Sequence, residues 1–481
     1  MKTFRPFPIV FLSLVLIFSA CKSSKIIEYP EDLDLPSTFQ IDGDTLSSSA
    51  LLSWESFFED QNLKDLIRFA LDNNQNNLIT LENIKVARAY FRQAKVGRLP
   101  EFNLFAGSSL TKFGEYTMDG VGNFDSNLSG NIPDEKRIPD PYEDFILGAD
   151  FNWEVDIWGK FKNRKKAALA RYIASEEMAN HTKTWLISEI AQAYYLLTGL
   201  DEELIILHES IELQELAVLL SKDLKLSGRE NQLAVDQFEA LTLNSKALLI
   251  EKQRELRTAE INLSKLLGNY SLEHERSMLD EIYQGPKVVS LGLPASLLAY
   301  RPDVRMAEKE LQATKADVQA AQADFFPSLN LGGFVGFNAF DFSRLFLMPA
   351  SGIYQIGAGL TAPVFNRNRI KAAFEIANTQ QRIAWYEYEQ TVLISYLEVL
   401  DILNQFDTYE NQVKLKADEV EVQKRSIENS NIMFSVGYAN YLEVINAQSR
   451  ALLSQLELIE LKTAQLQTKV KLYQALGGGW I

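Results

Sequence analysis

Few residues of this chain belong to types that do chemistry, and those few stand far apart. The 481 residues include one cysteine, Cys21, and three histidines, His181, His208 and His274. The first two histidines fall in one long predicted helix about 40 Å apart, so they cannot share a metal ion. No Ser-His-Asp pattern, phosphate-binding loop or nucleotide fingerprint is present. We therefore expect no enzyme, no metal site and no cofactor.

Cys21 stands where a targeting segment ends. Lys2 and Arg5 precede an apolar run at 9–20, which suits a signal peptide but is too short to cross a bilayer. The sequence FSAC at 18–21 resembles a bacterial lipobox, with Phe in place of the usual Leu, and predicts lipid attachment at Cys21. The alternative is an ordinary signal peptide followed by an incidental cysteine.

The composition of the chain argues against two further classes of protein. A net charge of −16 argues against nucleic acid, which would require a basic face. No stretch after the signal holds eighteen uninterrupted apolar residues, so no transmembrane helix is expected there. The function of the chain must therefore be inferred from its predicted long helices and its strands with alternating polarity.

A repeated pair of runs without helix breakers organises the chain. Residues 369–436 contain no Gly or Pro, Gly437 interrupts, and residues 438–476 are again free of both. Residues 160–227 carry only one Gly, and Gly228 separates them from the clean run 229–267. An offset of 209 residues aligns the two pairs without a gap over about forty residues. The pattern predicts two long-helix hairpins with tips at 227–231 and 436–441.

Strands with period-2 alternation precede each hairpin. In 145–157 the odd positions are apolar and the even positions mainly polar, and 355–364 alternates in the same way. Shorter alternating runs begin at Phe102 and Leu329, each just after a proline. Residues 107–143 form one long polar loop between the first two strands. The repeat therefore includes strands as well as helices.

Four such strands allow two interpretations. One is a soluble antiparallel sheet with one wet face. The other is part of a transmembrane barrel, which alternates apolar-out and polar-in. Four strands cannot close a barrel, and an open edge in lipid leaves backbone groups unsatisfied, so the second interpretation requires an oligomer. Strands that lead directly into long helices favour a barrel that continues into a helical tube. The alternative structure for the long helices is a dimeric coiled coil without a lumen.

Four stretches resemble the outer-membrane channels of bacterial tripartite efflux systems of the TolC/OprM type, most closely the NodT/OprM-like lipoprotein branch. They are spread along the whole mature chain in the order of the family. They are WESFFEDQNLKDLIRFAL at 54–71, DIWGKFKN at 156–163, GLPASLLAYRPDVRMAEKEL with AAQADFFPSLNL at 292–331, and GYANYLEVINAQSRALLSQ with LYQALGGGW at 437–480.

The resemblance implies a mainly α protein with a membrane β-barrel portion. Three chains, a homotrimer, would combine four strands each into one 12-stranded barrel, continuous with a periplasmic tunnel of duplicated helix hairpins. The family's partners are outer-membrane lipid, a periplasmic adaptor and an inner-membrane pump, here expected to be of the resistance-nodulation-division type. Localisation would be the cell outer membrane, lipid-anchored, and the duct would be passive.

Site residues carried over from the family lie at the hairpin tips. The adaptor-contacting tips correspond to Gly228 and Arg229, and to Gly437 and Tyr438. The periplasmic gate corresponds to Leu442, Glu443 and Asn446, at a position where relatives usually carry Asp instead of Asn446. Glu443 would then be the main charge of the constriction. The alternative for Glu443 is an ordinary solvated charge on a helix face.

The expected domain organisation follows the repeat. Residues 1–20 are a signal peptide, 21–53 a tether, 54–268 the first repeat, 269–291 a linker and 292–481 the second repeat. Within the repeats, strands are expected at about 101–110, 144–157, 327–339 and 352–365. Arg301-Pro302-Asp303 is interpreted as a helix start without chemistry. The function outside the channel class that remains open is a non-conducting coiled-coil scaffold lipoprotein of the envelope.

Overall fold

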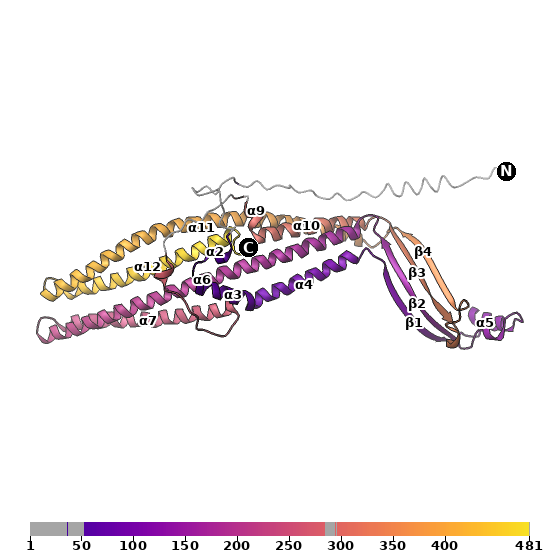
Figure 1. Cartoon of the computed structure of the whole chain (residues 1–481), viewed down its shortest axis with the longest axis horizontal. Helices are drawn as coiled ribbons and strands as arrows, with labels where there is room; N and C mark the ends of the chain where they lie inside the picture. The colour runs from indigo at the N-terminus through magenta and orange to yellow at the C-terminus, as the bar shows by residue number, and fades with distance from the viewer. Residues whose placement is uncertain (1–35, 37–51, 284–293, 295, 481) are drawn as a thin grey trace. The chain divides into compact units, whose positions relative to one another are not determined.

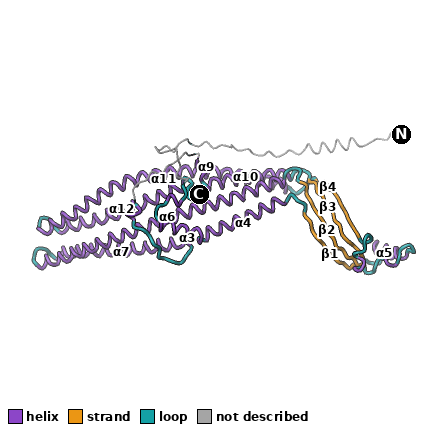
Figure 2. The backbone as a smooth tube through the Cα atoms, viewed as in Figure 1, coloured by secondary structure: helices purple, strands orange, loops and turns teal. Residues whose placement is uncertain are grey.

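The computed structural model describes residues 36, 52–283, 294 and 296–480. The predicted signal peptide, Cys21, nearly all of the predicted tether and residues 284–291 of the predicted linker lie outside the described residues. Helices dominate, and the strands form one small sheet (Figure 2).

The elements follow the order expected from the repeat. The first group is α2 (Trp54–Phe57), α3 (Gln61–Asn73), α4 (Gln75–Val96), β1 (Glu101–Thr111), α5 (Met118–Leu128), the 3-10 turn η2 (Asp134–Lys136), β2 (Tyr142–Val155), α6 (Lys160–Leu226) and α7 (Gln232–Leu267). The second group is α8 (Leu279–Ile282), α9 (Ser296–Tyr300), α10 (Pro302–Ala323), β3 (Ser328–Ala339), the 3-10 turn η3 (Phe342–Arg344), β4 (Gly352–Thr361), α11 (Arg369–Val436) and α12 (Tyr441–Ala475).

The duplication extends to the ends of the elements. Helices α4 and α10 have 22 residues each and start 227 positions apart. Helices α6 and α11 have 67 and 68 residues and start 209 positions apart, as predicted from the glycine positions. Figure 1 shows the two helix pairs, α6 with α7 and α11 with α12, each folded back on itself as a hairpin.

The described backbone divides into two compact units. The sheet unit holds residues 88–171 and 311–384, and the helical unit holds 52–87, 172–310 and the residues from 385 on. Each unit contains a part of both repeats, because the chain passes twice through each. None of the described helices is long and apolar enough to cross a membrane.

The sheet unit contains one antiparallel sheet in the order β1-β2-β3-β4. The register places most of the apolar residues of the four strands on one face, because Phe102 pairs with Phe151, Trp153 with Leu331, and Leu329 with Leu360. Many of these side chains are open to the surroundings: Leu104 is 87% exposed and Ile356 is 80% exposed. A largely apolar face with exposed large side chains fits contact with lipid.

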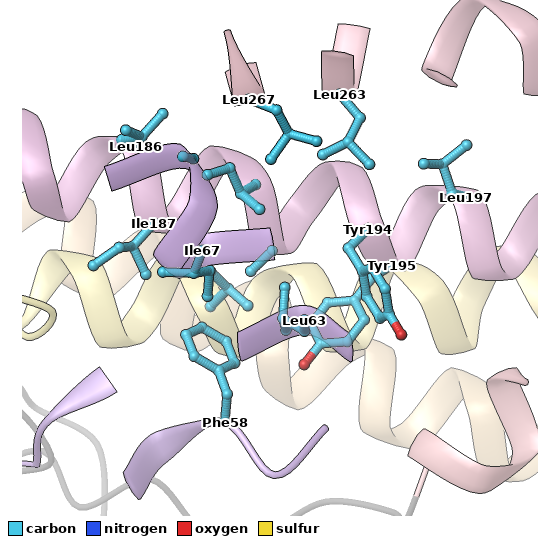
Figure 3. Close-up of a cluster of buried hydrophobic side chains, with 14 of the residues drawn as sticks. Phe58, Leu63, Ile67, Leu186, Ile187, Tyr194, Tyr195, Leu197, Leu263 and Leu267 are labelled. Atoms are coloured by element: carbon cyan, nitrogen blue, oxygen red, sulfur yellow. The ribbon is translucent and has the colours of Figure 1, made fainter. Parts of the chain in front are cut away.

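The helical unit has its largest core where α3 packs between α6 and α7 (Figure 3). The largest side chains of this core with no exposed surface include Leu63, Ile67, Leu186, Tyr194 and Leu263. Tyr194 donates a hydrogen bond to Asp60 and accepts one from the backbone N–H of Ser277, so its polar end is satisfied inside the core. This core anchors the region from which both hairpins extend.

Two sequence predictions were wrong in detail. Apolar residues at helical spacing over 54–71 predict one amphipathic helix. The structure has two helices there, α2 and α3, because Asp60 accepts the backbone N–H of Asn62 at 2.9 Å and caps a new start. The loop expected over 107–143 is shorter and contains α5, whose N-cap Thr117 accepts the backbone N–H of Gly120 at 3.2 Å. In both cases a side-chain cap outside the hydrophobic pattern decided the boundary.

Candidate functional site at the hairpin tips

The two tips share one backbone conformation. Gly228 and Gly437 both adopt a left-handed conformation, with φ of 73° and 81°, which a residue with a Cβ adopts only at a cost. Each tip then ends in an asparagine that caps the returning helix: Asn231 accepts the N–H of Ala234 at 3.0 Å, and Asn440 accepts the N–H of Leu442 at 2.9 Å. The predicted tips are therefore turns of the same shape.

The side chains of the two tips differ in chemistry. The first tip presents the exposed Arg229 beside Glu230. The second presents Tyr438, 84% exposed, and Val436, 58% exposed. A repeated backbone thus carries a charged tip and an apolar, aromatic tip.

An aromatic cluster joins the two hairpins close to their tips. Phe238 of α7 and Phe434 of α11 lie with ring centroids 6.2 Å apart, and Val444 of α12 completes the buried cluster. These three side chains are at most 6% exposed. The cluster fixes the spacing of the hairpins, so the tips are held as a pair rather than as independent loops.

The three predicted gate residues lie together on the exposed face of α12. Leu442 is 47% exposed, and Glu443 and Asn446 are also exposed, whereas Val444 and Ala447 are buried. Spacings of one and four residues on a helix account for this arrangement. Within one protomer this face of α12 is exposed. A residue that lines a lumen must be exposed in this way.

Glu443 also has a structural role. Its carboxylate accepts the backbone N–H of Asn440 at 3.1 Å and forms a reciprocal capping box with the asparagine side chain. A glutamate three residues after an asparagine N-cap is the sequence signature of a capping box, so this role of Glu443 could have been predicted from its distance to Asn440. Glu443 is therefore more than a solvated charge, whatever it faces in the assembly.

Arg450 is a charged residue near this face that sequence reasoning missed. It is exposed and follows Glu443 by seven residues, two helical turns further along the same side of α12. Its position places a cationic side chain about 10 Å along the helix axis from the one carboxylate of the predicted gate. The spacing i, i+7 was visible in the sequence.

Ion pairs hold the arms of each hairpin together. Lys252 of α7 contacts Glu203 of α6 at 2.8 Å, and Lys416 of α11 contacts Glu457 of α12 at 2.7 Å. Burial raises the pKa of Glu203 above its ordinary value. Burial alone would lower the pKa of Lys252, but the hydrogen bonds and charges of Glu203 and Glu255 together outweigh it and raise that pKa. Within the described residues, no group of three or more His, Cys, Asp and Glu is placed to hold a metal ion.

A buried arginine ties the second hairpin to the segment before α10. Arg301 donates to both oxygens of Asp303, to Glu398 at 2.7 Å and to the backbone carbonyl of Ala475 at 2.9 Å. Burial opposes a charge on Asp303, but the Arg301 hydrogen bond and charge outweigh it and hold the pKa of Asp303 below its ordinary value. The interpretation of residues 301–303 as a helix start was correct, since α10 begins at Pro302, but it missed this ion-pair network.

A sheet with one lipid-compatible face whose strands lead into long helix hairpins defines the class of outer-membrane channels with a helical extension. The chain belongs to the outer membrane efflux protein family, whose sequence model matches residues 66–269 and 293–478.

Known relatives match nearly the whole chain. Cation efflux system protein CusC of Escherichia coli O6:H1 is 27% identical over 472 residues, covering 97% of each chain. Outer membrane protein OprJ of Pseudomonas aeruginosa is 29% identical over 435 residues, covering 89% of this chain and 86% of OprJ. A crystal structure of CusC superposes with a TM-score of 0.81 at 26% identity and covers 94% of this chain and 99% of CusC.

These matches confirm the predicted fold class, localisation and function. The protein is mainly helical, with four strands that form its share of a trimeric outer-membrane barrel. It is an outer-membrane efflux channel, and channels of this family work as homotrimers with a periplasmic adaptor and an inner-membrane pump. The family assignment gives no support to the scaffold alternative.

Proposed function

We propose that the chain acts as a passive duct without enzymatic activity, and that its two hairpin tips form the periplasmic entrance. The observation that carries this proposal is the paired tip geometry: two turns of one shape, held together by a buried aromatic cluster. A homotrimer would present six such turns in a ring. An adaptor and a pump of the resistance-nodulation-division type would deliver the cargo and supply the energy.

The tips are proposed to bind the adaptor, with Gly228 and Arg229 in one and Gly437 and Tyr438 in the other. The glycines set the turn and the adjacent side chains make the contact. Replacing Tyr438 with Asp places a charge on the apolar tip and is expected to weaken adaptor binding. Arg229→Asp is the matched change at the other tip. Binding of the purified adaptor to each detergent-solubilised trimer measures both effects, and unchanged binding in both variants would remove the tips from the interface.

The gate is proposed to consist of Leu442, Glu443 and Asn446, one set from each protomer. Their shared exposed face supports this assignment. Replacing Leu442 with Ser removes an apolar side chain from the constriction, so single-channel conductance in planar bilayers should rise. Leu243→Ser, which alters an exposed leucine on α7, is the control. Equal conductance of the Leu442 variant and the parent would exclude Leu442 from the gate.

The N-terminus is proposed to be lipid-anchored through Cys21, and the domain boundaries are proposed to follow the two repeats. The lipobox at 18–21 supports the anchor. Metabolic labelling with palmitate tests it: the parent should incorporate label and Cys21→Ala should not. Label in the Ala variant would place the acyl chains elsewhere.

A further inference from the structure

A cavity lies in the helical unit beside the core that α3, α6 and α7 form. Its volume is about 380 Å³, and its walls come from α2, the start of α3, α6, α8, α11 and α12. Both repeats therefore contribute to it, whereas the residues proposed for the tips and the gate do not. A cavity of this size accommodates a small organic molecule rather than one or two waters.

Tyr195 presents an unused hydrogen-bonding group in the wall of this cavity. Its side chain is only 7% exposed, and among the described residues its hydroxyl has no hydrogen-bond partner. The neighbouring Tyr194 differs, since its hydroxyl is bonded to both Asp60 and Ser277. Figure 3 shows the two tyrosine rings together at one end of the core, with their hydroxyls directed away from the leucines of α7. Buried hydroxyls normally have a partner, so Tyr195 marks a point where a polar group of a ligand would be bound.

The wall of the cavity carries an excess of negative charge. Three carboxylates line it, those of Glu59, Asp60 and Glu281, and the cation among the lining residues is Lys469. The ammonium of Lys469 lies 5.6 Å from the ring centroid of Phe57. A wall with this balance of charge attracts a cation and repels an anion.

Asp60 brings this negative charge to the hydroxyl of Tyr195. Its carboxylate accepts hydrogen bonds from the hydroxyl of Tyr194, from the backbone N–H of Asn62 at 2.9 Å and from the hydroxyl of Ser277 at 3.2 Å, all of which are neutral donors. Burial raises the pKa of Tyr195, and the charge of Asp60 raises that pKa further. The carboxylate is thus held in place without a neutralising cation, and its field acts on the cavity where Tyr195 lines it.

Aromatic side chains form much of the remaining wall. They include Phe57, Phe58, Tyr283 and Phe406. Tyr283 is fixed there by the hydrogen bond from its hydroxyl to Gln465. Aromatic rings bury the apolar body of a ligand, and their faces also attract an ammonium group. Carboxylates beside aromatic walls are the combination that suits an organic cation.

We propose that this cavity binds a small organic ammonium ion, with its apolar body against Phe57, Phe58 and Phe406. The ammonium donates a hydrogen bond to the hydroxyl oxygen of Tyr195, which keeps its lone pairs free to accept, and is attracted by Asp60. The inference does not depend on the proposed function, because the cavity is separate from the tips and the gate. A bound ligand joins α2 and α6 to α8 and α12, so it stabilises the folded helical unit.

Isothermal titration calorimetry of the detergent-solubilised trimer tests the inference with three probes of similar size. Phenethylammonium carries the proposed charge, phenethyl alcohol is its neutral counterpart and phenylacetate carries the opposite charge. The ammonium probe should bind about tenfold more tightly than the alcohol, because hydrogen bonds of charged groups are the stronger ones, and phenylacetate should not bind. Titration into detergent alone gives the background.

Three variants locate the binding. Tyr195→Phe removes the hydroxyl but keeps the ring, and should raise the dissociation constant of phenethylammonium about tenfold. Glu281→Gln removes an exposed carboxylate of the wall and should raise that constant about threefold. Tyr386→Phe changes an exposed tyrosine on α11 outside the cavity and is the matched control. The mass of each solubilised trimer shows that the variants assemble.

Each outcome decides the inference. Preferred binding of phenethylammonium that Tyr195→Phe weakens and Tyr386→Phe retains supports it. Equal affinity for the ammonium and the alcohol, or an unchanged constant in Tyr195→Phe, overturns it. The lack of saturable binding of phenethylammonium to the parent trimer at millimolar concentration also overturns it. All of these results leave the proposed duct untouched, since conductance tests the duct separately.

Discussion

The two repeats make an equivalent hydrogen bond to the end of a long helix, but with different side chains. In the first repeat the buried Asn74, just before α4, donates its side-chain amide to the carbonyl of Leu266 near the end of α7 at 2.8 Å. In the second repeat Arg301, just before α10, donates to the carbonyl of Ala475 near the end of α12 at 2.9 Å. The donors are 227 positions apart and the acceptors 209, which are the two offsets of the duplication. A contact can thus be retained while the side chain that makes it changes from a neutral amide to a buried cation.

A second pair of positions retained both the contact and the residue. Gly268 and Gly477 end α7 and α12 with positive φ values of 71° and 93°. A Cβ on Gly268 would lie 2.7 Å from the carbonyl oxygen of Asn73, and one on Gly477 would lie 2.6 Å from the carbonyl carbon of Tyr300. Backbone-to-backbone packing leaves no alternative to glycine, whereas a side-chain donor can be replaced. The comparison therefore separates what the fold requires from what each repeat can vary.

The largest expected effect distinguishes Arg301 from Asn74. Arg301→Ala leaves Asp303 buried without its cation and should lower the free energy of unfolding by about 3–5 kcal/mol. Asn74→Ala removes a neutral donor and a helix cap and should cost about 1–3 kcal/mol. Thermal unfolding of the solubilised trimers, followed by circular dichroism, compares the two. Arg257→Ala, which changes an exposed arginine on α7, is the control. Equal losses for Arg301 and Asn74 would show that the added charge network contributes nothing to stability.

The glycines should give the next largest effects, and equal ones. Gly268→Ala and Gly477→Ala combine a positive φ with a backbone clash, so each should lower the free energy of unfolding by about 3 kcal/mol. Gly228→Ala has the same strain, but nothing lies within 4 Å of its Cβ, and its cost should be about 1 kcal/mol. The same unfolding measurement ranks all three. A loss at Gly228 as large as at Gly477 would mean that backbone strain, not close packing, accounts for the glycines in both repeats.

Low pH should also affect the two repeats differently, because only the contact in the second repeat depends on a group that titrates. The pKa of Asp303 is held below its ordinary value, so its ion pair contributes stability above the pKa of the unfolded chain and loses it as the pH falls through the lower, folded pKa. The contact of Asn74 does not titrate. Asp303→Asn should therefore reduce stability at neutral pH and flatten the decline of stability below about pH 4. Unfolding curves between pH 7 and pH 3 measure this, and parallel pH profiles for the variant and the parent would contradict it.

The sequence predicted whatever depends on local pattern. Breaker-free runs defined both hairpins, and alternation assigned the faces of β2 and β4, because periodicity reflects burial directly. The apolar positions of 118–128 also follow a helical spacing, but Gly120 and Gly122 within them obscured α5. Contacts between segments far apart in the chain were not predictable, since nothing local in the sequence links Arg301 to Ala475.

At the hairpin tips, too, local features could be predicted from the sequence and contacts between distant segments could not. The position of the tips followed from Gly228 and Gly437, and the shared face of the gate residues followed from helical spacing. The capping role of Glu443 was readable in principle from its distance to Asn440. The aromatic pair Phe238 and Phe434 was not, because it depends on how two hairpins pack side by side.

The smallest expected effect concerns the tips, where one repeat has a capping glutamate and the other does not. The first-hairpin counterpart of Glu443 is Ala234, which is buried, so α7 starts with an asparagine cap alone. Glu443→Ala should lower stability by about 0.5–1 kcal/mol, because it removes one hydrogen bond at an exposed helix end. Glu443→Gln retains a side-chain acceptor for the Asn440 N–H and should cost less. Local hydrogen exchange at the start of α12 measures the difference, since global unfolding is insensitive to a change this small. Faster exchange in both variants alike would mean that the negative charge itself, acting on the helix N-terminus, is what stabilises the second tip.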